Sequence, residues 1–272
     1  MVRVMPTPAV HLALAEEMLR RGDLSPAVCE FLMRYQGPFL LGHTAPDVRS
    51  VSGQDREDSH FYTVPRSSDR PACECLLAAH PTLIRSDALS NPQMAFVAGY
   101  LAHLELDELW LDDVFHVFVR GSWGPLRRRL FLHNVLRTWL DYQAQDRLGP
   151  RVAQTLRSVH PSSWLAFVRD EDLREWRDWL VRQLAPGHRM ETAEVFAERM
   201  GISASEIDAV ARSSDLMEER VFRHFSAAAL ESFQAAGYRR SVSVVEAYVG
   251  GLTHSGAGIE QLDITRTLQS IF

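Results

Sequence analysis

The chain has few cysteines and lacks a long apolar run. Its three cysteines are an odd number and too few for a disulfide framework in a chain of 272 residues. No stretch of about 18 consecutive apolar residues occurs, so we expect no transmembrane helix. The N-terminal sequence MVRVMPTPAVHLALAEEML has glutamates in its apolar section and no small-residue cleavage site. We therefore expect no signal peptide and a cytoplasmic location.

The motifs of several enzyme classes are also missing. There is no GxSxG, no GxxxxGK[ST], no GxGxxG, no HExxH and no paired CxxC. An adjacent His-Asp pair, which an HD-type phosphohydrolase needs, does not occur either. The net charge of −6 argues against a broad basic surface for nucleic acid. A nucleophilic serine or a nucleotide-binding loop is therefore not indicated.

Helical spacing of apolar residues dominates what is present, whereas strand-like alternation is scarce. We predict an all-α fold with a helical metal-binding core over residues 1–145. A C-terminal helical region over residues 146–249 is expected to pack on that core, and residues 250–272 are expected to form a tail. The segment from Gly37 to Arg70 is predicted to be a long polar loop that carries a site. Helical spacing covers residues 8–20, 25–35, 71–80, 92–118, 128–145, 151–158, 170–184, 191–200, 204–211, 214–236 and 239–249.

The stretch AFVAGYLAHLELDELW places a histidine and an aspartate on an apolar helix face. At about 100° per residue, His103 and Asp107 fall near the centre of that face. Glu105, Glu108 and Asp112 fall on the opposite side, where we expect solvent. Because aspartate is rarely buried without a partner or a metal, two interpretations remain open. His103 and Asp107 are either a buried hydrogen-bonded pair or two metal ligands.

Further candidate ligands lie elsewhere in the chain. His11 also sits on an apolar helix face with the neighbouring acids outside, while Asp47 and His60 lie in the long polar segment. His133 lies at the edge of the apolar face of its helix and is a further candidate. Imidazoles and carboxylates together suit zinc, with manganese or iron as alternatives. The candidate metal ligands are His11, Asp47, His60, His103, Asp107 and His133.

Three other residues are left open as members of the site. His43 lies four residues before Asp47 and is either a ligand or part of the site's lining. His116 points roughly 140° away from His103 if the helix continues. Asp113 is an alternative ligand if the site needs another carboxylate.

These residues resemble motifs of the bacterial zinc-dependent phospholipase C family, which is related to zinc-dependent single-strand nucleases. The resemblance covers roughly the first 145 residues and depends on order and spacing. It consists of an early helical histidine, a G-x-x-x-P-D loop, a histidine before an aromatic residue, and a G-x-x-x-H-x-x-x-D helix. In this chain they are His11, the GHTAPD run ending in Asp47, the SHF run with His60, and GYLAHLELD with His103 and Asp107.

The resemblance implies an all-helical fold with metal between the helices. Asp47, His60, His103 and Asp107 would form the central site, and Asp107 would bridge to a second ion held by His11. Position 113 is aspartate, and the residue four positions after His133 is arginine, so we expect one or two zinc ions rather than three.

The implied chemistry is hydrolysis of a phosphodiester by metal-activated water, with Asp47 as general base or as the group that orients the water. The substrate would be a small-molecule or lipid phosphoester. A nuclease would be favoured if Tyr62, Tyr100 and Trp110 formed stacking surfaces. The alternative function is a non-catalytic helical metal-binding or interaction protein, in which the metal is structural and has four protein ligands.

Overall fold

The computed structural model describes residues 6–185 and 190–254, and within these residues it contains helices and turns but no strand. The predicted all-α class is therefore confirmed. No helix in these ranges is long and apolar enough to cross a membrane. In chain order the helices are α1 (Pro8–Arg21), α2 (Pro26–Arg34), α3 (Gln36–Gly42), η1 (Ala45–Val48), α4 (Arg49–Ser52), α5 (Arg56–His60), α6 (Ala72–Ala79), η2 (Pro81–Ile84), α7 (Asn91–Trp110), η3 (Leu111–Phe115), α8 (His116–Arg120), α9 (Leu126–Gln145), α10 (Val152–Arg157), α11 (Asp170–Gln183), α12 (Thr192–Met200), α13 (Ala204–Ala211), α14 (Ser214–Met217), η4 (Glu218–Phe222) and α15 (Ala227–His254).

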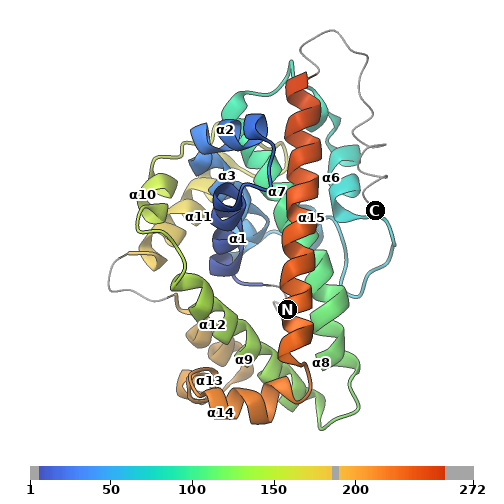
Figure 1. The fold of residues 1–272 in the computed structure, drawn as a ribbon, viewed down its shortest axis with the longest axis vertical. Helices are drawn as coiled ribbons and strands as arrows, with labels where there is room; N and C mark the ends of the chain where they lie inside the picture. Colours follow the sequence, from blue (N-terminus) through green and yellow to red (C-terminus); the bar gives the residue numbers. More distant parts are fainter. Residues whose placement is uncertain (1–5, 186–189, 255–272) are drawn as a thin grey trace.

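Helix α7 runs through the middle of the molecule beside the long C-terminal helix α15 (Figure 1). It begins where the Ser90 hydroxyl accepts a hydrogen bond from the backbone N–H of Gln93, and Pro92 occupies a favoured first-turn position. Helix α3 packs on another side of α7, and α6 also contacts it. As a result every residue of α7 from Met94 to Trp110 is buried.

This surrounding of α7 overturns one prediction. Glu105 and Glu108 were expected on a solvated face, but both are buried, and only Asp112 is exposed as expected. The Glu108 carboxylate accepts a hydrogen bond from the backbone N–H of Ala72 at 2.9 Å and forms an ion pair with Arg66 at 2.9 Å. Because Ala72 and Arg66 pair with it, the Glu108 carboxylate is buried, although the helical wheel assigns this residue to the solvent-exposed face.

Two glycines set the close approach of α3 and α7. A Cβ atom on Gly42 would overlap the carbonyl oxygen of Phe96, and a Cβ atom on Gly99 would overlap the carbonyl oxygen of Phe39. The two backbones are therefore in direct contact, which larger residues would prevent. This contact brings His43, the residue that follows α3, against the middle of α7.

The prediction of a long loop over residues 37–70 is wrong for most of its length. The segment contains most of α3 and all of η1, α4 and α5. Gly42 ends α3 and Gly53 ends α4, whereas Pro46 lies in the first turn of η1, so these residues do not interrupt all regular structure. Gly53 caps α4 with a left-handed conformation (φ 74°), and Phe61 caps α5 in the same way (φ 61°).

The C-terminal helix boundaries also differ from those predicted. The stretch 214–236 breaks between η4 and α15, and α15 then continues through Gly237 to His254. Gly237 faces Leu106 of α7 within this helix. A Cβ atom there would approach within 2.6 Å of a Leu106 methyl group, which explains why this helical position holds glycine. The expected tail is therefore helical as far as His254, and residues 255–272 lie outside the described ranges.

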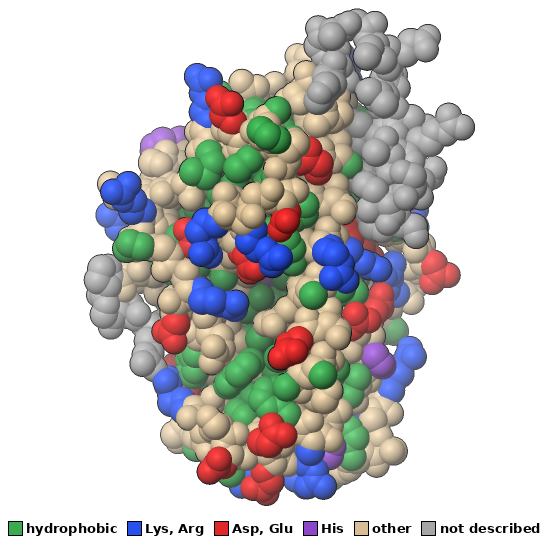
Figure 2. Space-filling model, in the orientation of Figure 1, with side chains coloured by type: hydrophobic (Ala, Val, Ile, Leu, Met, Phe, Trp, Pro, Cys, Tyr) green, Lys and Arg blue, Asp and Glu red, His purple; other side chains and the backbone are tan. Residues whose placement is uncertain are grey.

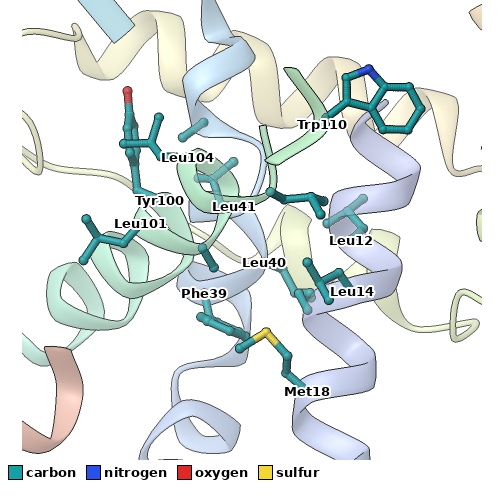
Figure 3. Close-up of a cluster of buried hydrophobic side chains, with 14 of the residues drawn as sticks. Leu12, Leu14, Met18, Phe39, Leu40, Leu41, Tyr100, Leu101, Leu104 and Trp110 are labelled. Carbon is teal, nitrogen blue, oxygen red and sulfur yellow. The ribbon is translucent and has the colours of Figure 1, made fainter. Parts of the chain in front are cut away.

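Helices α1, α3 and α7 pack together in one part of the core. Figure 3 shows leucine, methionine and aromatic side chains from these three helices packed together, among them Leu12, Phe39 and Tyr100. The main cluster of buried hydrophobic side chains extends from Leu12 to Leu252 and so joins residues from both halves of the chain. On the face shown in Figure 2, arginines and acidic side chains are interspersed.

Candidate metal centre

Helices α1 and α7 bring two histidine rings into contact. His11 lies in the second turn of α1, and His103 lies on the face of α7 that the sequence predicted. Their rings stack with centroids 3.8 Å apart and an interplanar angle of 12°, and both side chains are fully buried. The sequence could predict each inward direction, but not that the two helices would face one another.

Asp107 lies one helical turn beyond His103 and divides its two oxygens between different partners. Its Oδ1 lies 3.3 Å from Nε2 of His11. Its Oδ2 lies 3.4 Å from Nε2 of His103 and 3.4 Å from Nε2 of His60, which ends α5. One carboxylate therefore contacts three imidazoles that come from three helices.

Asp47 completes the cluster from the 3-10 helix η1. Its Oδ1 lies 4.0 Å from Nε2 of His60, and its side chain is nearly buried. The structure therefore brings together five of the six predicted ligands. His11, His103 and Asp107 form the tightest group, since one ligand atom from each lies within 4.8 Å of the others.

Neighbouring groups orient two of the imidazoles. Nδ1 of His103 lies 2.8 Å from the backbone carbonyl oxygen of His43, to which it donates, so Nε2 is left with its lone pair facing Asp107. Nδ1 of His60 lies 3.0 Å from the Ser59 hydroxyl, which leaves its Nε2 facing the same carboxylate. Metal-bound histidines commonly donate their other ring N–H to a carbonyl or carboxylate in this way.

The distances within the cluster fit a shared cation. Ligand atoms bound at about 2.0–2.1 Å around a tetrahedral zinc ion lie about 3.3 Å apart. The Nε2-to-carboxylate separations of 3.3–3.4 Å match that spacing. Among the described residues, the buried atoms without a hydrogen-bond partner include Nε2 of His11, His60 and His103 and Oδ1 of Asp107. Because buried polar atoms nearly always have a partner, the atoms of His11, His103 and Asp107, which lie within 4.8 Å of one another, point to one that they share, with His60 beside them.

The protonation states also suit metal binding. Burial acts to raise the pKa of Asp107, but His103, His11 and His60 outweigh it and hold that pKa well below its usual range. Burial and the nearby Arg56 lower the pKa of His60 to about 3. Burial and His103 also lower the pKa of His11. For His103, burial lowers the pKa but the Asp107 carboxylate outweighs it, so the pKa is raised. The ionised Asp107 carboxylate and the neutral imidazoles of His11 and His60 are in the form that binds zinc, whereas His103 would release its proton on binding.

Arg56 is a member of the site that the sequence prediction missed. Its Nη2 donates hydrogen bonds to Oδ2 of Asp107 at 3.0 Å and to the Tyr62 hydroxyl at 2.6 Å. Arg56 lies in a run of exposed acids, Asp55, Glu57 and Asp58, but it also lies four positions before His60. That spacing places both side chains on one helix face and is the signal that was available.

Several other candidates lie elsewhere. His133 is buried, but its Nε2 accepts a hydrogen bond from the Trp110 indole at 3.1 Å, and its ring packs against Phe115 and Phe118. Asp113 and His116 are exposed at the π-helical turn after α7 and its continuation. The sixth predicted ligand, His133, is therefore packed in an aromatic cluster and not placed with the other five.

The aromatic residues considered as stacking surfaces for nucleic acid bases are not exposed. Tyr100 and Trp110 are fully buried, and Tyr62 is nearly so. The Tyr100 hydroxyl donates to the backbone carbonyl of Ser59, and Tyr62 accepts from Arg56. These rings are buried, so the condition that would favour a nuclease, exposed stacking surfaces formed by these three residues, is not met.

A small pocket of about 40 Å³ adjoins the cluster on the side of Asp47 and Arg56. The two helices α9 and α12 close its other side with Arg137 and Thr192. The buried imidazoles do not line this pocket, so a bound molecule meets Asp47 and Arg56 first.

Comparison of the chain with protein-family models, with curated proteins and with solved structures gave no match. The resemblance to the zinc-dependent phospholipases C therefore depends on the short motifs of this sequence alone.

Proposed function

We propose that the protein is a metal-dependent hydrolase that cleaves phosphoesters by chemistry similar to that of the zinc-dependent phospholipases C. The observation that supports this proposal is the convergence of three Nε2 atoms on the Asp107 carboxylate at 3.3–3.4 Å. The pocket that begins at Asp47 and Arg56 gives a small molecule access to the edge of that cluster.

The donor set suits zinc, with manganese or iron as alternatives. His11, His60, His103 and Asp107 would hold one or two ions, with Asp47 at the side of the pocket. The two oxygens of Asp107 contact different histidines, and a carboxylate used in this way is able to bridge two ions. Bound metal would lower the pKa of the attacking water and offset negative charge on the phosphate.

Asp47 is the residue to which we assign proton transfer. The oxygen of a water molecule forms a bond to phosphorus while the bond from phosphorus to the leaving oxygen breaks. Asp47 accepts the proton released by the water, and the leaving oxygen takes up a proton, so a phosphodiester gives a phosphomonoester and an alcohol. The position of Asp47, between His60 and the pocket, puts its carboxylate beside both the cluster and a bound ester.

Arg56 favours a phosphoester over a neutral substrate. Its side chain lies in the wall of the pocket and contacts Asp107. Burial lowers the pKa of Arg56, but Tyr62 and Asp107 outweigh that effect, so the guanidinium remains charged. A fixed positive charge beside the reacting group stabilises the charge that develops on phosphate oxygens.

Hydrolysis of bis(4-nitrophenyl) phosphate and 4-nitrophenyl phosphate tests this function. The wild type loaded with zinc, manganese or iron is expected to release nitrophenolate with at least one of these metals. Asp47→Asn is expected to lower the rate by about 100-fold or more, because general base catalysis contributes that much. His116→Ala, an exposed histidine, is the matched control and should keep the wild-type rate. Equal rates for wild type and Asp47→Asn would reject the role assigned to Asp47.

A structural metal is the second candidate, and complete burial of the four central ligands favours it. His11, His60, His103 and Asp107 together would satisfy a closed four-coordinate zinc site with no position for water. In that case zinc would bind and stabilise the fold, but neither nitrophenyl ester would be hydrolysed with any of the three metals.

A further inference from the structure

The pocket beside Asp47 has two arginines in its wall. Arg56 comes from α5 and Arg137 from α9, and they are 5% and 3% exposed, respectively. The chain contains no lysine, so each of its 29 basic residues is an arginine. Burying two guanidinium groups is costly unless each has acceptors for its hydrogen-bond donors. Arg56 and Arg137 therefore place two positive charges in the wall of one pocket.

Arg56 retains one buried N–H group, at Nε, that has no hydrogen-bond acceptor among the described residues. Its Nη2 is used by Tyr62 and Asp107. Its position is fixed by those two bonds and by the Tyr62 ring, whose centroid lies 5.0 Å from the guanidinium carbon. A planar guanidinium held in this way is suited to an oxyanion.

Arg137 is held in place from the other side. Its Nη1 donates to the Asn134 side chain at 3.2 Å, and its guanidinium lies over the Phe196 ring at 4.1 Å. Both contacts leave the group in the wall of the same pocket. A residue stacked on an aromatic ring loses little additional freedom when it binds an anion.

The charges around the pocket favour an anion despite two acids. Asp47 and Glu191 line it. Arg49 and Arg199 lie close to Asp47: burial and then Arg49 lower the pKa of Arg199, and Asp47 opposes them. Arg56 and Arg137 in the pocket wall, together with Arg49 and Arg199 near Asp47, therefore outnumber the two acids.

The size of the pocket limits which part of a ligand it holds. Its cavity volume of about 40 Å³ compares with the roughly 10–15 Å³ that a cavity needs to hold one water molecule. This volume has room for a few water molecules, and a compact oxyanion therefore suits it. Trp179 and Val195 also line the pocket and offer apolar contacts to the rest of a substrate.

We propose that Arg56 and Arg137 form a phosphate-binding subsite beside Asp47, in which the two guanidinium groups bind the non-bridging oxygens of a phosphate ester. This inference rests on the proposed hydrolase function, because it assigns the substrate's phosphate to the pocket next to the metal ligands. It adds that the chain itself recognises phosphate, by arginine and not by metal alone.

Titration calorimetry with inorganic phosphate tests the subsite on the full chain, both after treatment with chelator and after loading with zinc. Wild type is expected to bind phosphate in both states and more tightly than acetate. Arg137→Gln is expected to weaken phosphate binding by about tenfold or more, and Arg137→Lys less so, because charge is kept but the planar fork is lost. Arg128→Gln, an exposed arginine on the same helix, is the matched control and should bind as wild type does.

The outcomes separate this subsite from the proposed function. Zinc bound by wild type without any phosphate binding would overturn the subsite and leave the metal centre standing. Phosphate affinity that is the same in wild type, Arg137→Gln and Arg137→Lys would also overturn it. Circular dichroism shows whether Arg137→Gln folds. If it does not, the subsite is tested by the phosphate affinity of Arg137→Lys and by whether wild type binds phosphate more tightly than acetate. Phosphate binding without zinc binding would support the subsite and reject the metal-dependent mechanism.

Discussion

Replacing Asp141 with asparagine should raise the free energy of unfolding at pH 8 and change it little at pH 4. Asp141 is fully buried on α9, where its Oδ2 accepts hydrogen bonds from Thr192 at 2.9 Å and Gln145 at 2.6 Å. Burial raises the pKa of Asp141 to about 6, although contacts with Thr7, Thr192 and Gln145 oppose the rise. The folded protein therefore prefers this carboxyl group in its protonated form.

The sign and size of the effect follow from the two states. A carboxyl group whose pKa is higher in the folded state contributes its full stability below the unfolded pKa and loses it as pH rises through the folded pKa. The rise from 3.8 to about 6 corresponds to about 3 kcal/mol, lost between about pH 4 and pH 6. Asparagine carries no charge and avoids this loss. Its amide replaces one acceptor with a donor, so we expect a gain at pH 8 of about 1–3 kcal/mol.

Urea unfolding followed by tryptophan fluorescence measures this difference across the range from pH 4 to pH 8. Asp146→Asn, at the exposed end of the same helix, is the matched control and should show the pH dependence of wild type. If Asp141→Asn and wild type lose stability in parallel between pH 4 and pH 8, the assignment of this pH dependence to Asp141 is refuted.

Three further predictions follow from the packing and contacts of the site. Gly99→Ala should destabilise the fold by about 1–3 kcal/mol in urea unfolding, because its Cβ atom would overlap the backbone of α3, and Gly250→Ala, where a Cβ atom meets open space, should not. Tyr62→Phe should cost about 1–2 kcal/mol in the same assay, since Arg56 loses one of its two acceptors, and an unchanged midpoint would contradict that role. Zinc at about 100 times its dissociation constant should raise the free energy of unfolding by about 3 kcal/mol relative to chelated protein, whereas His103→Ala should show no such response to zinc.

Helical periodicity was sufficient to predict the fold class and most helix positions, because apolar spacing is local information. It also gave the inward directions of His11, His103 and Asp107. It failed for Glu105 and Glu108, because a helical wheel assigns one face to solvent. Neighbours contributed by α6, α15 and Arg66 bury that face, and they come from distant parts of the chain.

The composition of the site could be predicted only in part. His60 and Asp47 carried short motifs, whereas Arg56 was hidden among exposed acids, and its role depends on a contact with Asp107, fifty-one positions away. His133 had the same local signal as His11, a histidine near an apolar face. Its packing among Trp110, Phe115 and Phe118 is a property of the tertiary structure and not of its own helix.

Metal content tests the central claim most directly. Elemental analysis of the purified protein should find one or two zinc, manganese or iron ions per chain in wild type. His133→Ala, which removes an equally buried imidazole from outside the cluster, should retain that content, and His103→Ala should lose it. A folded wild type that contains no metal, and that takes up none on dialysis against zinc, would contradict the claim. The five residues around Asp107 would then be a buried network of ion pairs and hydrogen bonds.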